Sequence, residues 1–271
     1  RSAGRPIGSL AGMDTKSASG GITLYGVGYS PWTERARWAL DHHRIAYRYR
    51  EHLPMLGEPM LRRRARAAGQ AKPTAPQLVY PGGAIGDSLA IMRFADARGH
   101  GSSLGSERPS TAEWAARMER GLDAGRARLT LAVLADREAL RESMLPVSPA
   151  PLAGVLSPVA AQAARFIVRK YGADARRVDE YVEVQREVCR DVREALDGRA
   201  HLDGDALSAR DLLAVSFLQM VQPVQHPRMP LLPALRRAWT AAPLVDEFRD
   251  VLAWRDGLYA SARGVRTKLA A

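Results

Sequence analysis

The stretch Ile22–Leu40, ITLYGVGYSPWTERARWAL, constrains the fold more than any other part of the chain. It predicts a short strand over Ile22–Tyr25, a glycine-containing turn and a helix that opens at Ser30-Pro31. Pro31 has no N–H to lose at the first helical position, and serine is a preferred N-cap residue. Free N–H groups and the positive end of the helix dipole then lie at the turn, so the sequence predicts an anion site there.

A second strand follows this helix closely. Tyr47 and Tyr49 alternate with arginines in Ile45–Arg50, as is typical of a strand with one face turned inward. Strand, helix and strand within about 30 residues form a βαβ unit with parallel strands and a right-handed crossover. A short basic helix, a hairpin around the turn Pro81–Gly83 and a final helix complete an expected α/β domain over residues 21–101.

A polar stretch rich in Gly and Ser, residues 99–109, is the best domain boundary. The pattern beyond it favours helices only, so residues 109–271 are expected to form an all-α domain. Residues 111–141 predict one long helix or two, and a Pro-rich loop follows at 144–158. Ser208 and Asp211 form a capping-box pattern before an apolar run. Residues 1–20 lack an apolar segment and are expected to be a flexible leader.

Composition limits the functional classes. The chain has a formal charge of +11 and a pI near 10.3, but its arginines are spread through amphipathic helices and only Arg62–Arg64 forms a tight run, which argues against nucleic-acid binding. No apolar run approaches the roughly 18 residues of a membrane span. Cys189 is the single cysteine, so an internal disulfide, a zinc cluster and a redox pair are excluded. We expect a cytoplasmic protein without a metal and with a buried, inert Cys189.

Two other readings of the opening stretch fail on single residues. Gly26 and Gly28 invite a dinucleotide-binding interpretation, but the third glycine of that motif would fall at Pro31. A disulfide oxidoreductase would need a cysteine at position 30, and serine cannot form the mixed disulfide.

Four motifs together resemble the cytosolic glutathione S-transferase superfamily. They are Ser30-Pro31-Trp32-Thr33 with Arg35, Arg37 and Trp38-Ala39-Leu40; Ala75-Pro76-Gln77-Leu78; Asp87-Ser88 with Ala90-Ile91; and Ser208 with Asp211. The resemblance covers nearly all of residues 21–260. It implies an α/β thioredoxin-like N-terminal domain, an all-α helical C-terminal domain and an active-site helix opening of the Ser/Cys type. Ala75 replaces the family's usual Val, and residues 70–73 lack its Gly-Lys.

The resemblance also implies a reaction, the transfer of glutathione, as co-substrate, to a small electrophile. A free thiol has a pKa near 8.5, and lowering it by about two units requires roughly 2.7 kcal/mol of thiolate stabilisation. A hydroxyl donor and the positive end of a helix can supply this. Ser30 is the expected donor; Tyr29 and Tyr25 are rival hydroxyls, and Ser30 acting only as an N-cap is the structural alternative. A non-catalytic ligand-binding or interaction protein of the same fold is the alternative function.

Further contacts are implied by the same resemblance. A cis peptide bond before Pro76 would turn the backbone of Ala75 toward the cysteinyl unit of glutathione. Asp87 and Ser88 would hold the γ-glutamyl end, with helix capping as the alternative. Arg62–Arg66 and Lys72 could meet the glycyl carboxylate, although a solvated basic helix explains them as well.

The second substrate is expected in an apolar pocket. Tyr29, Trp32, Trp114 and Arg117 are its candidate lining residues, and a place in the core is the alternative for the aromatic ones. The family is commonly dimeric, so a homodimer is expected.

Overall fold

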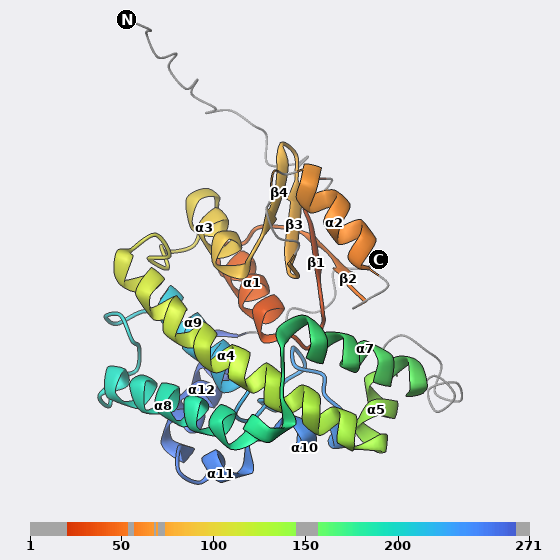
Figure 1. Ribbon diagram of the computed structural model, residues 1–271. Helices are drawn as coiled ribbons and strands as arrows, with labels where there is room; N and C mark the ends of the chain where they lie inside the picture. Colours follow the sequence, from red (N-terminus) through yellow and green to blue (C-terminus); the bar gives the residue numbers. More distant parts are fainter. Residues whose placement is uncertain (1–20, 54–56, 68, 70–73, 145–156, 264–271) are drawn as a thin grey trace, which may run out of the picture.

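The computed structural model describes residues 21–53, 57–67, 69, 74–144 and 157–263 (Figure 1). The predicted leader, Lys72, the departure at residues 70–73 and most of the predicted Pro-rich loop lie outside these residues. The first part of the described chain is a four-stranded sheet with three helices, and the rest is helical.

The sheet has the strand order β2-β1-β3-β4. Strand β1 pairs in parallel with β2, and antiparallel pairs join β1 to β3 and β3 to β4. Helices α1 and α3 lie on one side of the sheet and α2 on the other (Figure 1). The elements are β1 (Thr23–Gly26), α1 (Pro31–His42), β2 (Arg48–Glu51), α2 (Glu58–Ala67), β3 (Gln77–Tyr80), β4 (Gly83–Gly86) and α3 (Ser88–Arg98).

The helical part begins with α4, the longest described helix, which runs beneath the sheet domain in Figure 1. Its elements are α4 (Pro109–Ala135), α5 (Arg137–Met144), α7 (Ser157–Tyr171), the 3-10 turn η2 (Ala175–Arg177), α8 (Val178–Leu196), α9 (Ala209–Leu218), α10 (Pro233–Trp239), α11 (Ala242–Val245) and α12 (Arg249–Ala262). The segment predicted as one helix or two is two helices. Asp136 separates them, because its carboxylate accepts the N–H groups of Glu138 and Ala139 and thereby caps α5.

One continuous apolar core joins the two parts, with α1 of the sheet domain packed against α9. Leu24, Leu40 and Leu78 are fully buried on the sheet side, and Phe217 is fully buried on α9. Helices α4 and α9 approach closely because Gly121 of α4 lies against the Phe217 ring, where a Cβ atom would collide with it. The interface between the sheet domain and the helical domain is therefore a packed core and not a loose domain contact.

Several local predictions are confirmed. Ser208 and Asp211 form a complete capping box at the start of α9. Cys189 is buried in α8, and burial raises the pKa of its thiol well above the ordinary value, which fits an inert cysteine.

The first two strands begin one and three residues later than predicted. No helix in the described part of the chain is long and apolar enough to cross a membrane.

Candidate functional site

A cavity of about 590 Å³ lies between the sheet domain and the helical domain. Its sheet-domain wall is lined by the turn after β1, the start of α1, residues 51–53, two residues of α2 and the two loops that carry Ala75-Pro76 and Asp87-Ser88. Its helical-domain wall is lined by α4, by the alanine-rich face of α7 and by Met220, Leu235 and Trp239. The predicted site residues Tyr29, Ser30, Trp32, Ala75, Pro76, Asp87 and Ser88 all line this one cavity.

Ser30 occupies the N-cap position of α1, but its side chain makes no capping hydrogen bond. The helix is started by backbone contacts instead: the Glu34 N–H donates to the Ser30 carbonyl at 2.9 Å, and the Ser30 N–H donates to the Val27 carbonyl at 2.9 Å. The hydroxyl of Ser30 is therefore not consumed in capping. A free hydroxyl at the positive end of a helix, inside a cavity, is placed to donate to an anion.

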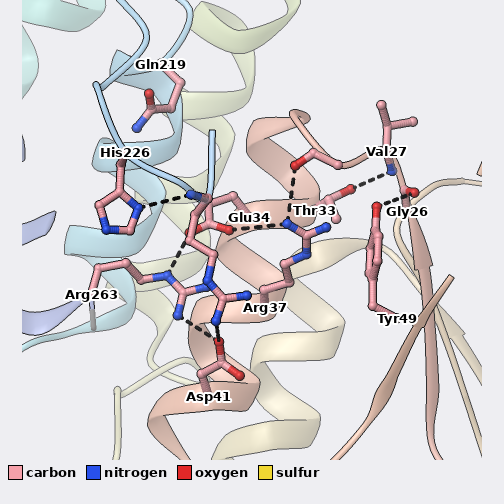
Figure 2. A network of polar contacts seen from close by, with 12 residues as sticks. Gly26, Val27, Thr33, Glu34, Arg37, Asp41, Tyr49, Gln219, His226 and Arg263 are labelled. Atoms are coloured by element: carbon pink, nitrogen blue, oxygen red, sulfur yellow. Dashed lines mark hydrogen bonds and ion pairs between the residues drawn. The ribbon is translucent and has the colours of Figure 1, made fainter. Parts of the chain in front are cut away.

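The turn that presents Tyr29 and Ser30 is tethered on several sides. The Val27 N–H donates to Thr33 Oγ1 at 3.2 Å, and the Tyr49 hydroxyl donates to the Gly26 carbonyl at 2.7 Å (Figure 2). The Gly28 N–H donates to Glu51 Oε1 at 2.8 Å. Gly26 must be glycine because a Cβ atom there would collide with the Thr33 side chain. Side chains of α1 and β2 thus fix the turn before a ligand arrives.

The Ala75–Pro76 peptide bond is cis, as the resemblance implies. Asp87 has a φ of 72° and ψ of 128°, a conformation that a non-glycine residue adopts only at a cost of about 1–3 kcal/mol. Its carboxylate accepts the Leu89 N–H at 3.1 Å, and its own N–H donates to Thr74 Oγ1 at 3.1 Å. Asp87 therefore caps α3, but its exposed carboxylate also stands at the cavity edge in a backbone conformation that capping alone does not require.

A buried arginine links the two walls of the cavity. Arg35 of α1 is 2% exposed; its Nε donates to Ser88 Oγ at 2.7 Å, and its Nη2 is bonded to Glu119 of α4. The other carboxylate oxygen of Glu119 accepts the Trp32 indole N–H at 2.8 Å. The sequence analysis did not assign a role to Arg35 or Glu119. Arg35 stood inside a recognised motif, whereas Glu119 is one acid in an amphipathic helix and carries no local signal.

The opposite face of α1 is held by a buried ion network (Figure 2). Arg263 is 3% exposed, and its guanidinium contacts both Glu34 and Asp41 at 2.7 Å. Arg37 lies 3.9 Å from Glu34, and Arg228 lies 3.3 Å from Asp41. The pKa of Arg263 is raised because its two carboxylate partners outweigh the effect of burial, so it stays charged. Residues from the far end of the chain therefore hold the helix that carries Ser30.

The half of the cavity that faces the helical domain is mainly apolar. The Tyr29 ring packs edge to face on Trp239, with the ring centres 5.9 Å apart. Burial raises the pKa of Tyr29 to about 12, with a smaller contribution from the charge of Glu51. Lys170 of α7 contacts Glu58 of α2 at 3.0 Å and so bridges the two domains at the cavity.

Two predicted pocket residues lie elsewhere. Trp114 is buried in the core, where its indole N–H donates to the Arg210 carbonyl at 3.1 Å, so the structural alternative is correct for this residue. Arg117 is exposed on α4, one helical turn from Trp114, and does not line the cavity. The face of α4 that lines the cavity is the one that carries Ala115, Ala116 and Glu119.

The remaining candidates are also outside the cavity lining. Tyr25 lies under the Arg64 guanidinium, 3.6 Å from the ring centre, which leaves Tyr29 as the rival hydroxyl. Arg62, Arg63 and Arg66 are exposed on α2, as expected of a solvated basic helix. No group of three or more His, Cys, Asp or Glu side chains among the described residues is arranged to hold a metal ion.

The mixed sheet followed by a helical bundle defines a thioredoxin-like domain joined to an all-α domain, as predicted. Residues 24–103 match the family described as the glutathione S-transferase N-terminal domain. The whole chain shares the fold of solved glutathione S-transferases, as the resemblance implies. A search of curated proteins finds no significant match.

Solved structures of glutathione S-transferases share the fold at low sequence identity. Glutathione S-transferase I bound with lactoylglutathione is 19% identical with a TM-score of 0.56, covering 90% of this chain and 97% of its own. The theta-class enzyme of Xanthomonas axonopodis pv. citri with glutathione bound is 19% identical, with a TM-score of 0.53. The match covers 92% of this chain and 99% of the Xanthomonas chain. Maize glutathione S-transferase I in complex with an atrazine glutathione conjugate is 19% identical, with a TM-score of 0.53. The match covers 89% of this chain and 93% of the maize chain.

Proposed function

We propose that this protein is a glutathione transferase that joins the glutathione thiolate to a small electrophile. The observation that carries the proposal is the Ser30 hydroxyl, which lines the cavity at the N-terminus of α1 without a capping bond of its own. Ala75, Pro76, Asp87 and Ser88, which the family resemblance connects with glutathione, line the same cavity. Solved structures of this fold that hold glutathione or a glutathione conjugate support the choice of ligand.

In this proposal Ser30 donates its hydroxyl proton to the thiolate sulfur as a hydrogen bond. The helix dipole adds a favourable field at the same point. Hydrogen bonds to charged groups contribute about 1.5–3 kcal/mol, which is the amount needed to lower a thiol pKa by one to two units. More of the glutathione is then thiolate at neutral pH, and the thiolate is the nucleophile.

The proposal assigns the two ends of glutathione to different parts of the sheet-domain wall. Ala75 meets the cysteinyl unit through its backbone, next to the cis bond of Pro76. Ser88 and its N–H, at the start of α3, face the γ-glutamyl carboxylate, and Asp87 faces the amine. Arg35 contributes by orienting Ser88, because its Nε already donates to the Ser88 oxygen and leaves the hydroxyl hydrogen free to donate to a ligand.

The test compares Ser30→Ala with Ser110→Ala, an exposed serine on the first turn of α4. We expect Ser30→Ala to lower kcat/KM toward a model electrophile about 100-fold, as is typical for loss of one preorganised donor, while glutathione-agarose still retains the protein. The ultraviolet absorbance of the bound thiolate should titrate at higher pH in this variant. Unchanged turnover would contradict the role of Ser30.

Retention on glutathione-agarose also separates catalysis from the non-catalytic alternative. A protein that only keeps the fold should not be retained and should show no conjugation. Retention that is lost in the double variant Asp87→Ala/Ser88→Ala would support the proposed glutathione site. We also propose a homodimer, which sedimentation as a monomer would contradict.

A further inference from the structure

A buried arginine of α4 holds the helical-domain wall of the cavity from behind. Arg128 is 7% exposed and is not itself a lining residue. Its guanidinium donates to the carbonyls of Met220 at 3.0 Å, of Thr240 at 3.3 Å and of Trp239. Its Nε donates to Gln185 Oε1 at 3.1 Å. Because Met220 and Trp239 line the cavity, one side chain outside the cavity ties together two parts of its wall.

The carbonyls that Arg128 binds lie where helices end. Met220 lies two residues beyond Leu218, the last residue of α9, and Trp239 is the last residue of α10. The last carbonyls of a helix have no partner within it, and buried carbonyls need a donor from elsewhere. Gln185 of α8 supplies a second donor, because its Nε2 donates to the Met220 carbonyl at 3.0 Å. Arg128 is the group that α9 and α10 share.

The Arg128 cation is held by hydrogen bonds and not by an acid. Burial alone lowers its pKa to about 10, with no opposing effect of a carboxylate among the described residues. Burying a cation without a counter-ion is costly unless hydrogen bonds compensate for the lost water. The planar guanidinium presents several N–H groups in a fixed fork, which a smaller donor cannot do. Arg128 therefore imposes a fixed geometry on the carbonyls that it joins.

The wall leaves little room for another arrangement. A Cβ atom on Gly125, one helical turn before Arg128, would collide with the Met220 side chain. The Trp239 ring packs edge to face on Tyr29, with the ring centres 5.9 Å apart. A shift of either backbone segment would therefore move a side chain that faces the cavity.

A second buried arginine serves the same stretch of chain without reaching the cavity wall. Arg255 of α12 is 1% exposed, and its guanidinium donates to the carbonyls of Leu218 at 3.1 Å and of Gln222. It also contacts Asp256 at 2.7 Å. Neither Leu218 nor Gln222 lines the cavity. Arg255 is thus a matched control, because it stabilises the segment after α9 through residues that a ligand in the cavity does not meet.

We propose that Arg128 is a positioning residue that sets the affinity of the cavity for the apolar second substrate by fixing Met220 and Trp239. This inference rests on the proposed glutathione transferase activity and assigns part of its substrate binding to a residue outside the cavity. The proposed glutathione contacts belong to the sheet-domain wall, whereas the hydrogen-bond partners of Arg128 all belong to the helical domain. Loss of Arg128 should therefore weaken binding of the apolar group and spare glutathione.

Calorimetric titration with two glutathione thioethers measures the two halves of the cavity separately. S-methylglutathione occupies the glutathione part, and S-hexylglutathione adds an apolar chain that reaches the opposite wall. We expect the unsubstituted chain to bind the hexyl compound about 10-fold more tightly, because burial of each added methylene group is favourable. Arg128→Met should reduce this preference about fivefold and leave the Kd of S-methylglutathione within about twofold. Arg255→Met should keep the full preference.

Arg128→Lys separates geometry from charge. The lysine ammonium keeps the positive charge but lacks the planar fork, so its preference for the hexyl compound should fall as in Arg128→Met. A full preference in Arg128→Lys would contradict the positioning role. Thermal unfolding of each variant checks the fold, and the lysine variant carries the test if Arg128→Met does not fold.

Other outcomes overturn the inference in distinguishable ways. An unchanged preference in Arg128→Met would mean that the wall does not depend on this residue. An equal loss in Arg128→Met and Arg255→Met would mean a general loosening of the helical domain. If the unsubstituted chain binds both thioethers equally, the wall does not receive the apolar group and the inference alone fails. If it binds neither, the proposed function fails and the inference fails with it.

Discussion

Helix α1 has two polar faces that are built in opposite ways. On the face toward α9 and the end of α12, Glu34 and Asp41 are enclosed with Arg263 in a buried network of opposite charges. On the side toward the cavity, in the turn that leads into α1, the hydroxyls of Ser30 and Tyr29 have no hydrogen-bond partner among the described residues.

The buried ion network and the free hydroxyls serve different purposes: the first stabilises the fold, and the second are available to a ligand. Buried polar groups that only stabilise a fold are matched within the protein, because an unmatched one costs about 1–3 kcal/mol. Hydroxyls that stay free inside a cavity gain their partners when a ligand binds. The charged face keeps α1 in place, and the free face is available for chemistry. Three changes test this contrast.

The largest effect is expected from Arg263→Met, which leaves Glu34 and Asp41 buried without their shared cation. Breaking a buried ion pair by removing one partner costs about 3–5 kcal/mol, so the free energy of unfolding in urea should fall by that amount. Arg249→Met is the matched control: its pair with Asp246 is largely exposed and should contribute at most about 1 kcal/mol. Equal losses in the two variants would show that the network is not a structural clamp.

A smaller loss in the free energy of unfolding is expected when the pH is lowered. Burial, with the nearby His42 charge, lowers the pKa of His43 at the end of α1, although its bond to Asp96 opposes the shift. The unfolded chain therefore takes up this proton at a higher pH than the folded one. The stability that neutral His43 contributes is present above the ordinary value of 6.5 and declines as the pH falls below it.

Urea unfolding at pH 8 and pH 5.5 measures this loss. His43→Asn should show a weaker dependence on pH, and the exposed His100→Asn should keep the dependence of the unsubstituted chain. A residual slope is expected, because burial also lowers the pKa of His52 and of His226. An undiminished slope in His43→Asn would contradict the assignment.

The smallest effect on stability is expected from Ser30→Ala, the change predicted to damage catalysis. Because Ser30 makes no side-chain cap, its removal should alter the free energy of unfolding by less than about 0.5 kcal/mol. Ser208→Ala removes half of a complete capping box and should cost about 1–2 kcal/mol. If Ser30→Ala costs as much as Ser208→Ala, the serine is a cap after all.

Local motifs predicted much of this molecule. The family resemblance implied the cis bond at Pro76. From the residues themselves, Pro31 marked the first residue of α1, and Ser208 with Asp211 marked the start of α9. Each depends on backbone chemistry within a few residues, which a sequence displays directly. For the same reason the order of elements was predictable, while strand ends shifted by one to three residues.

Other features required the assembled fold. Trp114 and Glu119 both belong to α4, yet only Glu119 lines the cavity, because the packing of α9 decides which face of that helix is covered. Arg263 contacts Glu34 across more than 200 positions of sequence, and no local pattern announces such a pair.

The sequence by itself determined that a strand, a turn and a proline-started helix would place Ser30 at a helix N-terminus, since propensity and capping act over short distances. Only the tertiary structure decided that the Ser30 hydroxyl stays free, that Tyr29 turns toward Trp239, and that the two stand in one cavity. Those outcomes depend on side chains from distant elements filling or leaving space around them, and that is a property of packing.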